Sequence, residues 1–104
     1  MDNMEQLQAV VNEVQAARQQ VANLRAQVVE LETTVDSVRN QPEELALHQQ
    51  MGGVLVEVSD RKALLEDLEQ TLSTLNEHLA RFTDREAQLM ATYEELQAVL
   101  KGSE

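Results

Sequence analysis

Cysteine and tryptophan are absent from this 104-residue chain, and phenylalanine and tyrosine occur once each. Without cysteine the chain can form neither a disulfide nor a thiolate metal site. With 2% aromatic residues it also has few of the large rings that fill compact cores. A conventional globule is therefore not expected. One proline and three glycines suit long helices instead.

Basic residues are scarce as well, since 8 Lys and Arg stand against 19 Asp and Glu and give a net charge of −11. Such a chain repels nucleic-acid phosphates and anionic lipid surfaces. No apolar run approaches the roughly 20 residues that cross a bilayer, and no basic region precedes an apolar one at the N-terminus. We expect no membrane insertion, no nucleic-acid partner and a cytoplasmic location.

Two runs of apolar residues step alternately by three and four positions. The first comprises Leu7, Val10, Val14, Ala17, Val21, Leu24, Val28, Leu31, Val35 and Val38. The second comprises Leu65, Leu68, Leu72, Leu75, Leu79, Phe82, Glu86, Leu89, Tyr93, Leu96 and Leu100, with Glu86 as its one polar member. Heptad spacing of this length predicts two coiled-coil helices, at about 5–39 and 60–101. The segment between them holds Pro42 and a Gly-Gly pair, so the second helix can return antiparallel to the first.

The middle of the chain predicts a β-hairpin at about 44–58. Gly52 and Gly53 precede an alternating β-branched run, which is typical of a two-residue loop with a type I′ turn. The expected cross-strand pairs on the mainly apolar face are Met51 with Val54, Gln49 with Val56 and Leu47 with Val58. The other face pairs Gln50 with Leu55 and His48 with Glu57.

A two-stranded ribbon is marginally stable alone in water, and both of its edges are open. We therefore expect ribbons from other subunits to complete it. The predicted oligomerisation residues are Leu47, Met51, Gly52, Gly53, Val54, Leu55, Val56 and Val58. The predicted fold class is mainly α: a long antiparallel two-helix coiled coil with one β-hairpin between the helices, in a single domain over residues 1–104.

The run Gln-Met-Gly-Gly-Val-Leu-Val-Glu at residues 50–57, placed between two helices of this length, resembles the hairpin of β-class prefoldin subunits, most of all the eukaryotic subunit 2 type. The family usually has an aromatic residue where His48 stands and a basic one where Gln49 stands. The resemblance implies a hexamer of two α-class and four β-class subunits that holds unfolded proteins without ATP. It also implies delivery to a cytosolic chaperonin, with actin and tubulin as typical clients.

The helix ends far from the hairpin are the expected client-binding region. The residues of the two heptad runs form the seam between the helices. At these helix ends the seam residues have no further layer above them, and apolar residues outside the seam add to the exposed surface. The predicted client-binding residues are Met4, Leu7, Val10, Val11, Met90, Tyr93, Leu96, Val99 and Leu100. The alternative is that these are ordinary coiled-coil ends. Glu86 should lie near Ala17 and within reach of Arg18, where it either fixes the register or bends out to water.

Enzymatic signals are missing. His48 and His78 have no second ligand at metal-binding spacing, and there is no phosphate-binding loop or nucleophile elbow. We expect neither an enzyme nor a metal or cofactor site. The competing interpretation is a coiled-coil adaptor or tether without chaperone activity, which would need only the two helices and not the Gly-Gly ribbon.

Overall fold

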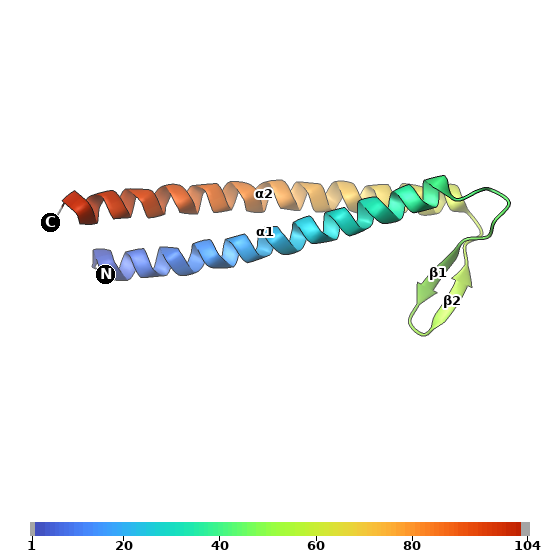
Figure 1. The fold of residues 1–104 in the computed structure, drawn as a ribbon, viewed down its shortest axis with the longest axis horizontal. Helices are drawn as coiled ribbons and strands as arrows, with labels where there is room; N and C mark the ends of the chain where they lie inside the picture. Colours follow the sequence, from blue (N-terminus) through green and yellow to red (C-terminus); the bar gives the residue numbers. More distant parts are fainter. Residues whose placement is uncertain (1, 103–104) are drawn as a thin grey trace. The chain divides into compact units, whose positions relative to one another are not determined.

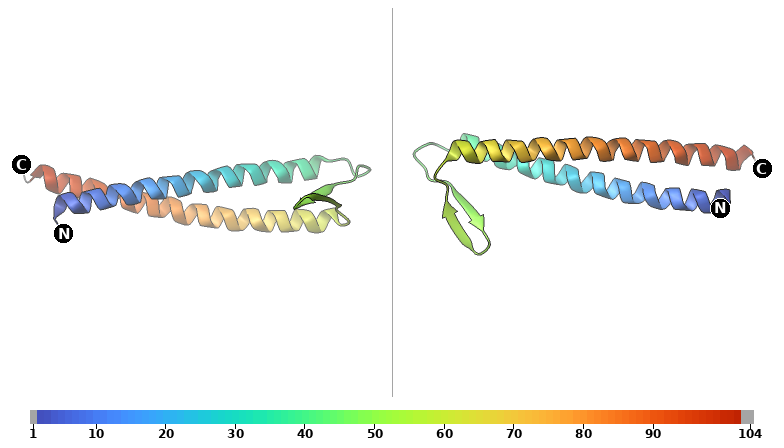
Figure 2. Two further views of the ribbon diagram at one scale, coloured as in Figure 1. Left: turned by 90° about the horizontal axis from the view of Figure 1, so that it is seen from below. Right: turned by 180° about the vertical axis from the view of Figure 1, so that it is seen from behind.

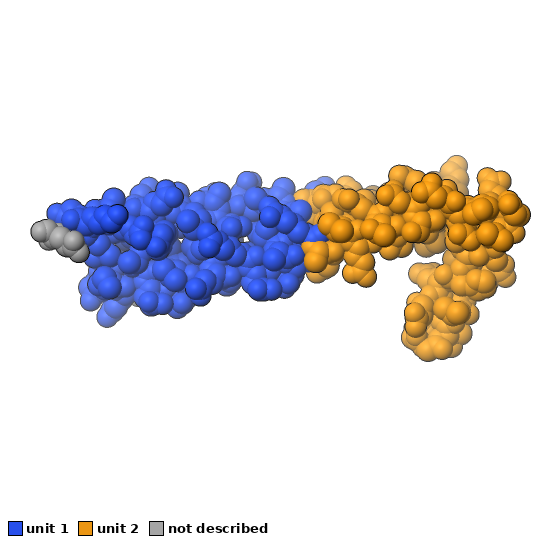
Figure 3. All heavy atoms as spheres, viewed as in Figure 1, with its two compact units in different colours: residues 1–25, 77–104 blue, residues 26–76 orange. Residues whose placement is uncertain are grey.

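The computed structural model describes residues 2–102 and contains four elements (Figure 1). Helix α1 spans Asn3–Asn40, strand β1 His48–Met51, strand β2 Val54–Glu57 and helix α2 Arg61–Gly102. Two long helices with an antiparallel two-stranded hairpin between them confirm the predicted fold class. The chain divides into two compact units, unit 1 with Met1–Arg25 and Glu77–Glu104 and unit 2 with Ala26–Asn76 (Figure 3).

Unit 1 contains the first part of α1 and the last part of α2. These helical segments run in opposite directions, so the start of α1 and the end of α2 lie at the same end of the unit (Figure 1, Figure 2). The seam residues Val14, Ala17 and Val21 are buried between them. The ion pair between Arg18 and Glu86 joins the two segments at 3.5 Å.

Unit 2 contains the rest of both helices and the hairpin. Val28 and Val35 are its buried seam residues, and an ion pair between Arg39 and Glu69 links the two helical segments. The buried positions in both units belong to the first heptad run, where Val and Ala are small enough to be covered. The larger seam residues of α2 stay half-buried, because a pair of helices has no third layer to cover them.

Capping residues fix where the helices begin. The Asp2 carboxylate accepts a hydrogen bond from the Glu5 amide at 2.7 Å, and the Asp60 carboxylate accepts one from Ala63 at 3.1 Å. Each aspartate thereby satisfies an amide of the first turn that has no partner within the helix. Helix α1 ends two residues before Pro42, as expected of a residue that disfavours helical geometry just before it.

The turn between the strands differs from the expected type. Gly52 has a φ of 63°, while no other described residue has a positive φ. A positive φ at the first central position alone is the pattern of a type II′ turn, whereas type I′ requires it at both. The two-residue loop is therefore confirmed, but the predicted turn type is wrong.

Candidate functional site

The hairpin has the pairing that the sequence predicts. Its register places Met51 opposite Val54, and one strand position further Gln50 lies opposite Leu55. The amide of Val58 donates to the Leu47 carbonyl at 2.9 Å and extends the pairing beyond the strands. The alternation of faces follows from this register, so one face of the ribbon is mainly apolar.

Most of the predicted oligomerisation residues are exposed. The side chains of Met51, Val54, Leu55 and Val56 are between 44% and 68% exposed. Leu47 and Val58, at the base of the ribbon, are half-buried. Four large apolar side chains thus remain in contact with water on a short ribbon, which is the surface expected of an incomplete interface.

Sequence reasoning did not identify Arg61, which holds the loop before the hairpin. Its guanidinium donates to the carbonyls of Gln41 at 2.6 Å, Pro42 at 3.2 Å and Leu45 at 3.0 Å. One side chain at the start of α2 therefore fixes the backbone that leads from α1 to β1. The sequence did contain a signal for Arg61. A cation in the first turn of a helix is disfavoured by the helix dipole, so an arginine directly after the Asp60 cap is expected to have another role.

The nine predicted client-binding residues all lie in unit 1. Met4 is 63% exposed and Val99 is 50% exposed. The remaining seven are half-buried: Leu7, Val10, Val11, Met90, Tyr93, Leu96 and Leu100. The structure thus gives this end of the unit a partly covered apolar surface with two prominent side chains.

A notch lies between the two helical segments of unit 1. It has a volume of about 190 Å³ and is lined by Val11, Val14, Gln15, Arg18, Met90 and Tyr93. Three of these residues, Val11, Met90 and Tyr93, belong to the predicted client-binding set. The notch is large enough for an apolar side chain, and the flexible thioether of Met90 suits a wall that must adapt to different shapes.

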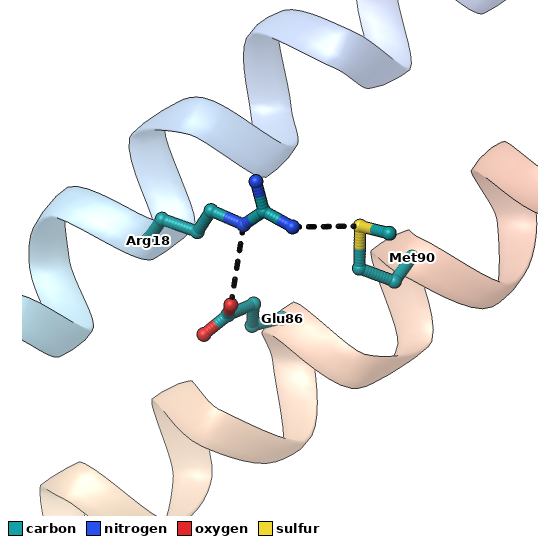
Figure 4. Close-up of polar contacts among 3 residues, drawn as sticks. All are labelled: Arg18, Glu86 and Met90. Atoms are coloured by element: carbon teal, nitrogen blue, oxygen red, sulfur yellow. Dashed lines mark hydrogen bonds and ion pairs between the residues drawn. The ribbon is translucent and has the colours of Figure 1, made fainter.

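Two residues that line the notch, Arg18 and Met90, take part in polar contacts with each other and with Glu86 (Figure 4). The Arg18 guanidinium donates to the Met90 sulfur at 3.4 Å and pairs with the Glu86 carboxylate at 3.5 Å. The prediction that Glu86 lies within reach of Arg18 is confirmed. The Glu86 side chain is still 26% exposed, so this ion pair lies at the edge of the seam. The buried layers of the seam therefore remain apolar.

The described part of the chain contains no cluster of three or more His, Asp and Glu residues that could hold a metal ion. Within the same residues no helix combines the length and the apolar character that crossing a membrane requires.

Comparison with known proteins assigns the chain to a family. Residues 1–103 match the family described as "Prefoldin subunit". The crystal structure of the prefoldin beta subunit from Thermococcus strain KS-1 is similar, with a TM-score of 0.88 and 19% sequence identity over 97% of this chain and 88% of that chain. No curated protein sequence matches significantly. The match over nearly the whole length, together with the single hairpin between two long helices, leads to the conclusion that this chain belongs to the prefoldin subunit family and has the fold of a prefoldin β subunit.

Proposed function

We propose that this chain is a subunit of an ATP-independent chaperone of the prefoldin hexamer type, located in the cytoplasm. In this proposal the hairpin joins α-class and other β-class subunits, and the end of unit 1 formed by the start of α1 and the end of α2 holds unfolded clients for delivery to a cytosolic chaperonin. Actin and tubulin are the client types that the resemblance to the eukaryotic subunit 2 type implies.

The observation that carries the proposal is the exposed apolar surface of the hairpin. A ribbon of eight strand residues that exposes Met51, Val54, Leu55 and Val56 has no apolar partner of its own. Covering such surface contributes roughly 25 cal/mol for each Å² removed from water. Pairing of the open strand edges with further strands would satisfy their remaining backbone groups as well. An adaptor that used only the helices would have no need of this surface.

Client binding is supported by the chemistry at the end of unit 1. Exposed Met4 and Val99, together with a notch in the same unit that Met90 lines, suit weak contact with many apolar sequences. Several such ends in one assembly would hold a client more tightly than one end can, because the second contact forms at a high effective concentration.

Aggregation of a chemically denatured client, followed by light scattering, tests the client-binding region. The assembled complex with Met4→Ser and Val99→Ser should suppress aggregation less well than the wild type. The matched control is Val29→Ser, because Val29 is 62% exposed on α1 but lies in unit 2.

Native mass measurement of each variant separates loss of binding from loss of assembly. The proposal holds if the control suppresses aggregation as the wild type does, and if the double variant assembles but suppresses aggregation less well. Equal activity of all three assemblies would place client binding elsewhere, and an assembly that suppresses no aggregation would favour the adaptor.

A further inference from the structure

Four residues on α2 form a surface that departs from the acidic character of the chain. His78, Arg81, Phe82 and Arg85 line a hollow of about 350 Å³ in unit 1. Arg81 and Arg85 are exposed, while His78 and Phe82 are half-buried. We call these four residues the basic patch. None of them belongs to the hairpin or to the proposed client-binding set.

The spacing of Arg81 and Arg85 does not stabilise the helix. Residues four apart lie on the same side of a helix, and two like charges at this spacing destabilise it by about 0.2–0.5 kcal/mol. Within residues 2–102, neither Arg81 nor Arg85 forms an ion pair, although Glu77 and Asp84 are close in sequence. The two guanidinium groups are therefore available to an external anion.

Three other arginines of the chain have partners, whereas exposed Arg25 has none among the described residues. Arg18 pairs with Glu86, Arg39 pairs with Glu69, and Arg61 donates to three loop carbonyls. These contacts hold parts of the same chain together. Arg81 and Arg85 are therefore not among the arginines that hold the fold together.

The geometry of the basic patch selects the kind of anion. A guanidinium binds a carboxylate through two parallel hydrogen bonds, and Arg81 and Arg85 are about 6 Å apart along the helix axis. Alternate residues of an extended peptide are separated by roughly 6.6 Å, so two carboxylates at such positions match the two arginines. The half-buried ring of Phe82 lines the same hollow and offers an apolar contact.

We propose that the basic patch binds an extended acidic segment of a partner protein, with carboxylates on alternate residues paired to Arg81 and Arg85. The net charge of −11 opposes long polyanions such as RNA, while a short segment with few charges is attracted by the local pair. The contact is exposed, so it should weaken as salt is added.

Fluorescence anisotropy with a labelled peptide of alternating glutamate and threonine tests the proposal at low ionic strength. The double variant Arg81→Gln and Arg85→Gln should bind this probe about tenfold or more weakly than the wild type, because both bidentate contacts are lost. The variant Arg81→Lys and Arg85→Lys keeps the charge but not the paired donors, so its affinity should be intermediate.

The matched control is Lys62→Gln with Lys101→Gln, which changes the net charge equally at two exposed sites outside the basic patch. It should bind as the wild type does, and a probe with glutamine in place of glutamate should not bind. An equal loss in the control, equal binding of the glutamine probe, or unaltered binding by the lysine variant would overturn the proposal. So would preferential binding of an RNA oligonucleotide of the same charge, or no binding of the acidic probe by the wild type.

Discussion

Replacing Arg61 with methionine should loosen the connection from α1 to the hairpin while leaving the helices formed. Arg61→Met keeps much of the aliphatic part of the side chain but removes all three donors to the loop carbonyls. The Pro42 and Leu45 carbonyls are in exposed contacts, so water can replace the guanidinium there. The contact to Gln41 is partly buried and has the shortest distance, 2.6 Å.

The magnitude follows from that difference between the three contacts. A hydrogen bond to a charged group contributes about 1.5–3 kcal/mol, and we count one such bond, because the two exposed carbonyls are rehydrated when the arginine is lost. A tenfold change in an equilibrium corresponds to about 1.4 kcal/mol. Local opening of residues 41–58 should therefore become about 10 to 100 times more frequent.

Hydrogen exchange measured by mass spectrometry resolves this segment from the helices. Peptides covering residues 41–58 should exchange faster in Arg61→Met, and peptides covering residues 14–35 should not change. Lys62→Met is the matched control, since it removes a neighbouring exposed cation that the helix dipole disfavours. Unchanged exchange of residues 41–58 in Arg61→Met, or the same acceleration in the control, would refute the role given to Arg61.

Three further pairs of substitutions test other parts of the structure by urea unfolding or by assembly. Val28→Ala should lower the free energy of unfolding by about 1.5–2.5 kcal/mol, because Val28 is 6% exposed, whereas Val29→Ala at a 62% exposed position should stay within about 0.5 kcal/mol. Similar losses of unfolding free energy in the two variants would contradict the placement of Val28 in a buried seam. Gly52→Val should cost about 1–3 kcal/mol at a φ of 63° and reduce assembly more than Gly53→Val, so equal effects would argue against the type II′ turn. Glu86→Leu should stabilise the chain by about 1 kcal/mol or more, because it places an apolar side chain in the seam. Arg18→Gln should change stability by less than about 1 kcal/mol, because the ion pair that it removes is partly exposed. A destabilised Glu86→Leu would show that the pair matters more than apolar packing.

The helices and the hairpin could be predicted because their signals are local or periodic. An unbroken three-and-four spacing indicates which side of each helix is buried, and Val14, Val21 and Val28 are indeed among the buried residues. The Gly-Gly loop indicates the strand register, which pairs Met51 with Val54 as expected. The single-domain interpretation and the roles of the client-binding residues stay predictions.

Other features depend on contacts that no short pattern encodes. The three carbonyl partners of Arg61 come from residues 16 to 20 positions away, in a loop without regular structure. The turn type depends on how the strands approach their loop, because glycine permits either sign of φ at both central positions. The notch beside Met90 depends on side chains from both helical segments. Periodicity placed Val14 and Tyr93 in the two heptad runs but did not indicate the notch.

The central claim is that the hairpin of this chain is completed by hairpins of other prefoldin subunits. Native mass spectrometry after co-expression with an α-class partner measures this directly. The account predicts a hetero-oligomer that contains this chain, and a smaller amount of this oligomer when the chain carries Gly52→Val. A chain that remains monomeric with every partner, or an oligomer that survives Gly52→Val unchanged, would contradict it.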